Sequence, residues 1–265
     1  MRLFALLHTH FAGESLNRSS LNPNEQLPLQ ARLWTHPPSS AAFHIIAVIT
    51  GGLALDATFG WPGQYATILW TLCVWAWLYQ CGGSEERRVL ILCTAISGFG
   101  EVILSLVWGL YDYQFANVPL FVPPGHALLM TLGLITSHQL VKHKAGRAFQ
   151  AILPLAAFIY AVFAFSLGFD QFGAALFGVY AVCMVLSTAR MLYSTMFVLA
   201  LAMELYGTAL GNWSWLETTP GLGITSANPP FSAGAFYCLL DLLVLGAMKL
   251  WSRHSLIAAP SRARP

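Results

Sequence analysis

Two glutamates lie within strongly apolar stretches, and a pair of aromatic residues follows each of them. The two sets are Glu101 with Tyr111 and Tyr113, and Glu204 with Trp213 and Trp215. A carboxylate in hydrocarbon is unfavourable unless it is paired, hydrated or protonated, so an acid in such a place points to function. A single buried acid can also simply bond a neighbouring helix, but two acids in matching positions favour a functional role.

The chemistry that fits these residue types is proton transfer. Burial disfavours the charged form of a carboxyl group, and two acids that face one cavity leave one protonated beside one ionised. A proton given to an unactivated carbon–carbon double bond makes a tertiary carbocation, which aromatic faces stabilise where water is excluded. We therefore predict Glu101 and Glu204 as catalytic acids and the aromatic pairs as substrate-binding residues. The alternative is that the aromatic residues only anchor the chain at the membrane surface.

Four further residues are candidates for the same site. Asp241 lies in the middle of the last apolar stretch and is either another catalytic acid or a group that pairs helices. His126 begins the fourth apolar stretch and either points toward Glu101 or is a capping, hydrogen-bonded histidine. Asn117 and Asn228 follow the two aromatic pairs in matching positions, and we include them as substrate-binding residues.

The elements that position these residues are expected to be membrane-spanning helices. The chain is 57% hydrophobic and 9% charged, far from the roughly 25% charged residues of soluble domains. We predict an all-α integral membrane protein with about eight transmembrane helices, because eight apolar stretches approach the length that crosses a bilayer. Their ranges are 41–59, 64–80, 89–110, 120–140, 148–168, 172–188, 191–211 and 231–250.

The basic residues predict how these helices are oriented. All 13 Lys and Arg fall in the N-terminal segment, in alternate connections or at the C-terminal end. Because cytoplasmic segments are enriched in Lys and Arg, we expect a multi-pass protein of the cell (inner) membrane with both termini cytoplasmic. The opposite loops carry acids instead: Asp112, Asp170 and Glu217, with Asp56 expected as an ordinary exposed acid near the outer end of the first span.

An internal repeat joins the two glutamates. A shift of about 103 residues places Glu101 on Glu204 and the first four spans on the last four. The match includes Trp108–Tyr113 with Leu210–Trp215, Asn117–Phe121 with Asn228–Phe231 and, more weakly, Asp56–Gly60 with Asp170–Gly173. Because each copy has an even number of spans, the second copy begins on the same side of the membrane as the first. We therefore predict two tandem parallel four-helix repeats. The expected organisation is a cytoplasmic arm (1–40), repeats at 41–140 and 141–250, and a cytoplasmic tail (251–265).

Several other kinds of site are not expected. The five cysteines have no CxxC spacing, which argues against a disulfide framework or a zinc site. His8 and His10 lie in the N-terminal arm, where a flexible polar segment is favoured over a metal site. No repeated HxxxH spacing and no nucleotide-binding glycine loop is present. We therefore predict no metal, no cofactor and no nucleic-acid partner.

The two motifs also resemble a known family. Glu101, then Tyr111-Asp-Tyr113 and Val118-Pro-Leu-Phe-Val-Pro123, and Glu204, then Leu210-Gly-Asn-Trp-Ser-Trp215, are similar to the carotenoid biosynthesis membrane proteins that include the carotenoid 1,2-hydratases. The likeness covers residues 98–126 and 204–234. It departs from the family at Gly125-His126 and Ile224-Thr225, so it supports a common architecture better than an identical reaction. By this resemblance, the two glutamates act on an isoprenoid end group framed by the aromatic pairs.

The leading functional prediction is a membrane-embedded, cofactor-independent enzyme that protonates a double bond of an isoprenoid or carotenoid. Such an enzyme is a hydratase, a cyclase or an isomerase, and its lipid-soluble substrate requires a cavity that opens sideways into the bilayer. A small proton-coupled transporter is the main alternative, because parallel repeats with acids inside the membrane are also found there. A non-catalytic membrane assembly subunit is the third.

Overall fold

The computed structural model describes residues 28–257, with side chains up to Trp251. The predicted histidines of the arm, His8 and His10, lie outside the described residues, as does the end of the tail. Within the described part of the chain, a helix occupies each of the eight predicted apolar ranges. They are α3 (Ala41–Phe59), α4 (Trp61–Cys81), α5 (Ser84–Glu101), α6 (Val122–Leu140), α7 (Lys144–Leu167), α8 (Gln171–Leu186), α9 (Arg190–Leu210) and α10 (Gly234–Ile257).

Five of the described helices are long and apolar enough to cross a membrane: α3, α5 with its extension, α7, α9 and α10. Helix α8 is apolar but has only 16 residues. Helices α4 and α6 are longer, yet they are not among the five, because polar and aromatic residues lower their hydropathy. The chain is thus mostly helical and membrane-associated by composition, while the crossing of α4, α6 and α8 stays a prediction.

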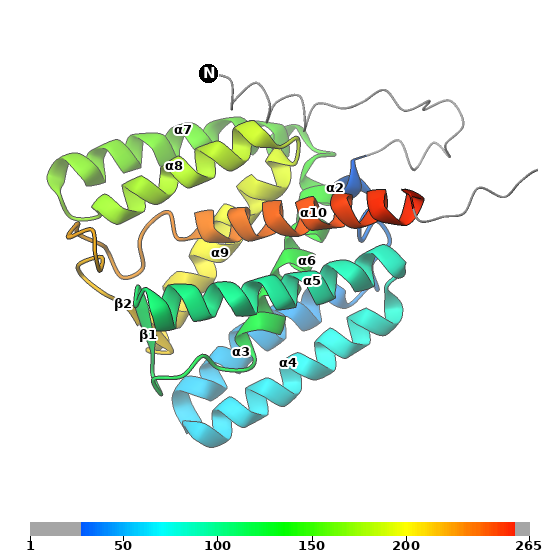
Figure 1. The fold of residues 1–265 in the computed structure, drawn as a ribbon, viewed down its shortest axis with the longest axis horizontal. Helices are drawn as coiled ribbons and strands as arrows, with labels where there is room; N and C mark the ends of the chain where they lie inside the picture. Colours follow the sequence, from blue (N-terminus) through cyan, green and yellow to red (C-terminus); the bar gives the residue numbers. More distant parts are fainter. Residues whose placement is uncertain (1–27, 258–265) are drawn as a thin grey trace, which may run out of the picture.

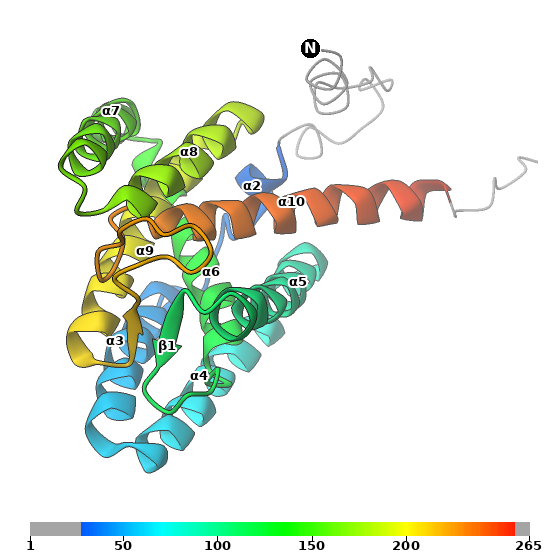
Figure 2. The ribbon, with the colours of Figure 1, turned by 60° about the vertical axis from the view of Figure 1, so that its left-hand side comes forward.

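The helices form a central group with a helix pair on either side (Figures 1 and 2). In the centre, α6 and α10 contact each other, and each of them also contacts α5 and α9. The pair α3 and α4 packs on one side of this group, and the pair α7 and α8 packs on the other. Glu101 lies at the end of α5 and Glu204 lies in α9, so both acids are carried by the central helices.

Two features after Glu101 were not predicted. The stretch 89–110, expected as one regular helix, changes after Glu101 into a π-helix, η3 (Val102–Val107). A short strand follows, β1 (Tyr111–Tyr113), and it pairs antiparallel with β2 (Trp213–Trp215). Periodicity misses both because a π-helix is as apolar as an α-helix and three-residue strands are too short to show alternation.

The strand pair joins the two halves of the chain symmetrically. Asp112 lies opposite Ser214 in the middle of the pair, and an aromatic residue lies opposite an aromatic residue on either side. The amide of Leu216 donates to the carbonyl of Leu110, and the amide of Gln114 donates to the carbonyl of Asn212. Antiparallel pairing with equivalent bonds at both ends is what a two-fold relation between the halves requires.

A glycine precedes each strand by two residues and allows the chain to turn there. Gly109 has φ +70° and Gly211 has φ +83°, a left-handed conformation that other residues adopt only at a cost. Gly211 caps α9, and its amide donates to the carbonyl of Thr208. Glycine is therefore favoured at both positions, which the predicted repeat places on each other.

The segment before α3 is part of the predicted N-terminal arm, and it packs on the end of the bundle where the basic residues lie. Short helix α2 (Leu29–Arg32) is followed by Leu33 and Trp34, both buried. Arg32 forms an ion pair of 3.1 Å with Glu85 at the start of α5. Gln30 donates to Thr188 in the α8–α9 connection. These bonds hold residues 29–34 beside a connection that is predicted to be cytoplasmic.

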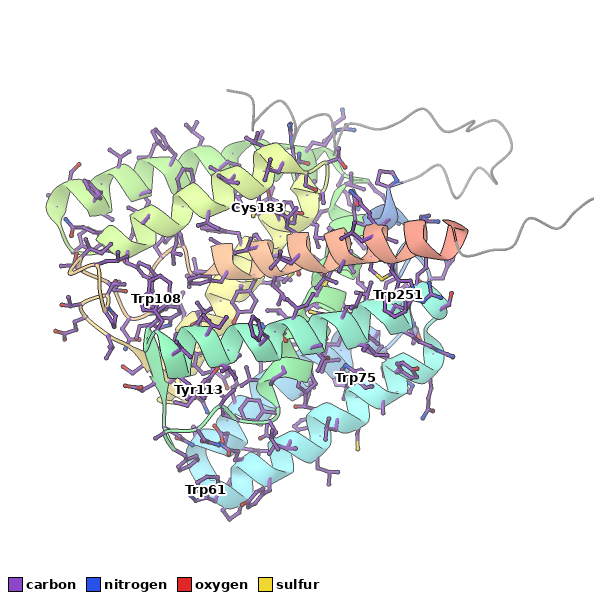
Figure 3. All side chains as sticks on the ribbon, in the orientation of Figure 1. Trp61, Trp75, Trp108, Tyr113, Cys183 and Trp251 are labelled. Atoms are coloured by element: carbon purple, nitrogen blue, oxygen red, sulfur yellow. The ribbon has the colours of Figure 1, made fainter. Side chains whose placement is uncertain are left out.

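Tryptophans occur near both ends of the helices (Figure 3). Trp61 and Trp108 lie toward the end that carries the strands, and Trp251 lies toward the opposite end. All three side chains are exposed. Because tryptophan is favoured where hydrocarbon meets water, this distribution fits a bundle with a membrane interface at each end.

Candidate active site

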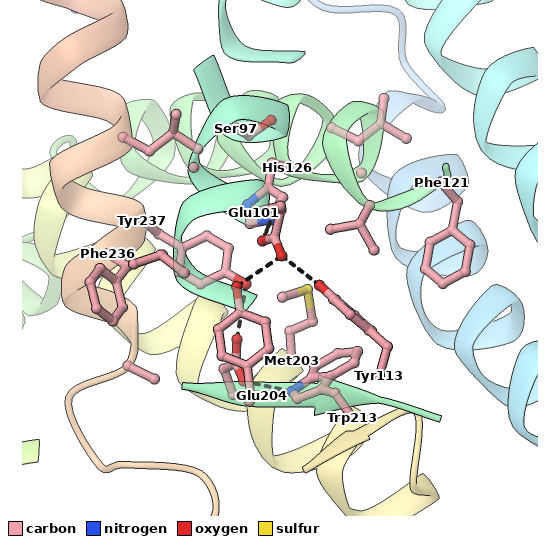
Figure 4. A pocket seen from close by; sticks show the side chains of 18 of the residues that line it. Ser97, Glu101, Tyr113, Phe121, His126, Met203, Glu204, Trp213, Phe236 and Tyr237 are labelled. Atoms are coloured by element: carbon pink, nitrogen blue, oxygen red, sulfur yellow. Dashed lines mark hydrogen bonds and ion pairs between the residues drawn. The ribbon is translucent and has the colours of Figure 1, made fainter. Parts of the chain in front are cut away.

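Three side chains surround the carboxylate of Glu101 and make hydrogen bonds to it (Figure 4). The hydroxyls of Tyr111 and Tyr113 donate to Oε2 at 2.8 and 2.7 Å. Nε2 of His126 lies 2.9 Å from Oε1, so of the two alternatives for His126 the structure has the one in which it points toward Glu101. The other ring nitrogen, Nδ1, is buried and has no hydrogen-bond partner among the described residues.

Glu204 is held in the same way by different residue types. The indole N–H groups of Trp213 and Trp215 donate to its Oε2 at 2.8 and 3.0 Å. The hydroxyl of Tyr237, in α10, donates to Oε1 at 3.0 Å. Glu101 is 6% exposed and Glu204 is 5% exposed, so each carboxylate obtains its polar contacts from the protein.

Tyr237 is a residue of the site that sequence reasoning missed. Its ring stacks on the ring of His126, with centroids 4.8 Å apart and planes at 23°. A signal was present, since His126 follows Asn117 by nine residues and Tyr237 follows Asn228 by the same number. His126 contacts Glu101, and Tyr237 donates to Glu204. His126 lies in α6, which follows β1, and Tyr237 lies in α10, which follows β2.

The aromatic pairs are part of the site rather than simple membrane anchors. In each strand the two aromatic side chains are buried and the residue between them is exposed, which is the alternation of a β-strand. Strand geometry therefore explains why the motifs are spaced as YxY and WxW. Burial and the charge of Glu101 raise the pKa of Tyr111 and of Tyr113 well above its usual range, so both phenols stay protonated as donors.

Both glutamates line a single cavity of about 330 Å³. Its wall is mostly apolar and is built by the four central helices, both strands and parts of α3 and α4. The four aromatic residues of the strands also line it, together with His126 and Tyr237. Ligand pockets are typically apolar with a few convergent polar groups, and this cavity has that character.

The cavity reaches the outer surface of the bundle between α5 and α10. Three residues of its wall are exposed: Phe99 (68%), Ile103 (38%) and Leu243 (51%). All three are apolar, and they lie on α5, η3 and α10. The opening therefore faces sideways, toward the region that lipid chains would fill, as expected for a lipid-soluble substrate.

Asp56 was predicted to be an ordinary exposed acid, and this was wrong, because the residue is 1% exposed. Its carboxylate accepts hydrogen bonds from Asn212 at 2.8 Å and from Gln64 at 3.3 Å. Asn212 precedes β2, so this contact fixes the second-half motif against the first half. Asp170 is also buried, where it caps α8 and accepts a bond from the amide of Phe231.

Three other predicted site residues do not line the cavity. Asn228 accepts a bond from the amide of Trp215 at 3.0 Å, so it holds β2 in place. Asn117 donates to Gln64 at 3.2 Å. Asp241 is 0% exposed, and neither of its carboxylate oxygens has a hydrogen-bond partner among the described residues. It lies one turn after Tyr237 in α10, outside the wall of the cavity.

Among the described side chains, no three His, Cys, Asp or Glu residues lie close enough together to hold a metal ion. Comparison with protein-family models, with curated proteins and with solved structures finds no match for this chain. The resemblance to the carotenoid biosynthesis membrane proteins therefore stays a prediction from the two motifs.

Proposed function

We propose that this chain is a cofactor-independent membrane enzyme that protonates a carbon–carbon double bond of an isoprenoid or carotenoid. The observation that carries the proposal is the pair of buried glutamates in one apolar cavity that opens sideways. An aqueous substrate would not need that opening, whereas a lipid-soluble polyene can pass through it from the bilayer. A proton can then be given to carbon where little water competes for it.

The two glutamates take different roles because their partners differ. An indole N–H only donates, so Oε2 of Glu204 is fixed as an acceptor by two tryptophans. Histidine can both give and accept a proton, and only Glu101 has a histidine among its partners, whereas Glu204 is bonded to two tryptophans and Tyr237. The exchangeable proton therefore lies between Glu101 and His126, while Glu204 provides a fixed negative end for the cavity.

In the proposed reaction, the proton held by Glu101 and His126 moves to one carbon of the double bond. The π electrons form the new C–H bond, and the other carbon becomes a tertiary cation. The aromatic rings of the strands and the carboxylate of Glu204 stabilise this cation. Addition of water followed by loss of a proton to Glu101 gives an alcohol. Loss of a neighbouring proton to Glu101 gives an isomer. Attack by a second double bond closes a ring and moves the cation to another carbon, and loss of a proton to Glu101 then gives the neutral cyclic product.

The proposed architecture is two parallel four-helix repeats in the cell membrane, with all eight helices crossing it and both termini in the cytoplasm. The symmetric strand pair and the matching glutamate clusters support the repeat. In this orientation the described basic residues gather at the cytoplasmic end, where Gln30 meets the α8–α9 connection. The strands then lie toward the opposite surface.

The test is expression in cells that accumulate linear carotenoids, with mass spectrometry of lipid extracts. Hydration adds about 18 mass units, and cyclisation or isomerisation gives a product of equal mass with a different retention time. General acid catalysis contributes roughly 10²- to 10⁴-fold, so Glu101→Gln should lower product formation by at least about 10²-fold. The control is Glu217→Gln, because Glu217 is exposed and lies outside the cavity.

An inactive wild-type protein across the isoprenoids tested, together with proton-dependent uptake of a solute into vesicles, would favour transport instead. Full activity in the Glu101→Gln variant would also contradict the proposal, because product formation would then not depend on this acid. The uptake assay uses vesicles that contain protein purified from the same expressing cells, so enzyme activity and transport are compared for one expressed protein.

A further inference from the structure

The cavity is not equally open beside its two glutamates. Gly100 precedes Glu101, and Gly125 precedes His126, the α6 residue that contacts Glu101. In the second half, Met203 precedes Glu204, and Phe236 precedes Tyr237, the α10 residue that contacts Glu204. The two glycines, Met203 and Phe236 all line the cavity. Figure 4 shows the side chains of Met203 and Phe236 in its wall. The duplicated site therefore has two glycines at the positions where the other half has two large apolar side chains.

Neither glycine is explained by the backbone. Gly100 lies within α5 and Gly125 within α6, and neither has a positive φ. Glycine weakens a helix relative to alanine because it increases the conformational freedom of the unfolded chain. A backbone reason for glycine is present elsewhere, as at Gly109 and Gly211, but not at these two positions.

Close packing does not explain them either. A Cβ atom added at Gly100 or at Gly125 would meet no atom within 4 Å. In contrast, a Cβ at Gly207 would collide with the ring of Trp213, and one at Gly234 would come within 2.6 Å of the carbonyl oxygen of Phe197. The space over Gly100 and Gly125 belongs to the cavity, so side chains there would reduce the volume that a ligand can occupy.

The same space is connected to the lateral opening. Phe99 precedes Gly100, and Ile103 is one helical turn after Phe99; both are exposed and line the cavity. Leu243, exposed on α10, lies on the other side of the opening. The free volume thus runs from the carboxylate of Glu101 past apolar side chains to the outer surface.

We propose that one end group of a linear polyprenyl chain occupies the space over Gly100 and Gly125, against Glu101, and that the rest of the chain leaves between α5 and α10. Met203 and Phe236 fill the equivalent space beside Glu204, so only one of the two duplicated positions receives substrate. Gly100 and Gly125 then determine the size of the end group. This inference rests on the proposed function and names the position and the class of its substrate.

The experiment measures retention of a linear carotenoid, lycopene, by the full chain purified in detergent from cells that produce it. The bound polyene is quantified per chain by its visible absorption. Overfilling a packed site commonly costs enough free energy for a roughly tenfold loss of affinity. We expect Gly100→Leu and Gly125→Leu to lower retention by at least about tenfold. The matched control is Gly178→Leu, since Gly178 is an exposed helical glycine with open space around it and does not line the cavity.

Alanine variants at the same two positions distinguish a loss of polyene binding from a loss of folding. Gly100→Ala and Gly125→Ala should keep or raise the thermal unfolding temperature, because alanine favours the helix, and they should lower retention partially. Retention equal to wild type in both leucine variants would overturn the inference, as would a wild-type protein that retains no polyene. Retention without any reaction product would leave the inference standing and would contradict only the proposed chemistry.

Discussion

The tryptophans that hold Glu204 give the most specific prediction for single residues. Trp215→Phe keeps an aromatic ring but removes one of the two indole donors to Oε2. In the proposed reaction the carboxylate of Glu204 stabilises the cation, and this donor fixes the position of the carboxylate. Loss of one preorganised electrostatic contact of this kind commonly costs about 10²- to 10³-fold in rate. We expect product formation to fall by about 10²-fold in the carotenoid assay, with little change in the amount of polyene retained.

Trp61→Phe is the control for this variant. Trp61 is exposed, stacks on Phe115 and does not line the cavity, so its replacement should leave the rate unchanged. An equal loss of rate in both variants would show that the effect comes from general destabilisation rather than from the donor to Glu204.

The acids and aromatic residues of the site could be predicted from the sequence, because each is unusual in its surroundings. Glu101 and Glu204 are charged residues in apolar helices, and their repetition exposed the duplicated motif. Asp56 was misjudged, since a sequence position near a helix end does not reveal that Asn212, far along the chain, covers the carboxylate. Tyr237 was missed because a tyrosine in an apolar helix is not unusual in itself.

At the scale of elements, the contact between α9 and β2 depends on a glycine. The ring of Trp213 packs directly on Gly207, one turn after Glu204. Gly207→Ala would force the indole away and separate its N–H from the carboxylate. Overpacking of this kind costs roughly 1–3 kcal/mol, so we expect a lower thermal unfolding temperature together with a loss of activity.

Gly178→Ala is the comparison for that variant, because an added Cβ there meets no atom within 4 Å. It should leave the unfolding temperature unchanged or raise it slightly, as alanine favours a helix. If Gly207→Ala behaved in the same way, the packing of Trp213 on α9 would not be needed for the site.

The contact between Asn212 and Asp56 links α3 to the start of β2 and can be tested separately. Asn212→Ala removes two donated bonds, to Asp56 at 2.8 Å and to the carbonyl of Leu53 at 3.1 Å. A buried acceptor left without its donor costs about 1–3 kcal/mol. Thermal unfolding in detergent should therefore shift downward, whereas Gln80→Ala, at an exposed position, should have no effect.

The predicted bounds of a helix agree closely with the structure where hydropathy alone determines them, as for α3. The change from α5 to η3 could not be predicted, since it depends on how the following strand is held. The hydroxyl of Ser105, in η3, donates to the carbonyl of Tyr111 at 3.2 Å, which ties the π-helix to β1. The pairing of β1 with β2 joins residues about 100 positions apart, and no local pattern contains that information.

At the scale of the whole molecule, the orientation in the membrane is the main prediction. Single cysteines can be introduced into a variant whose native cysteines are replaced by serine. We expect Asp112→Cys to react with a membrane-impermeant maleimide added outside intact cells, and Lys142→Cys to react only after the cells are opened. Both positions are exposed in the structure. Labelling of Lys142→Cys in intact cells would reverse the proposed orientation.

The antiparallel strand pair has a further consequence for how the chain can be assembled. The connection between α6 and α7 is a short exposed turn around Lys142 and His143, and it carries no part of the cavity wall. A chain cut there would yield two fragments, each with one strand edge that only the other fragment completes. The halves expressed as separate polypeptides should therefore find each other, copurify, and restore activity that neither fragment has alone.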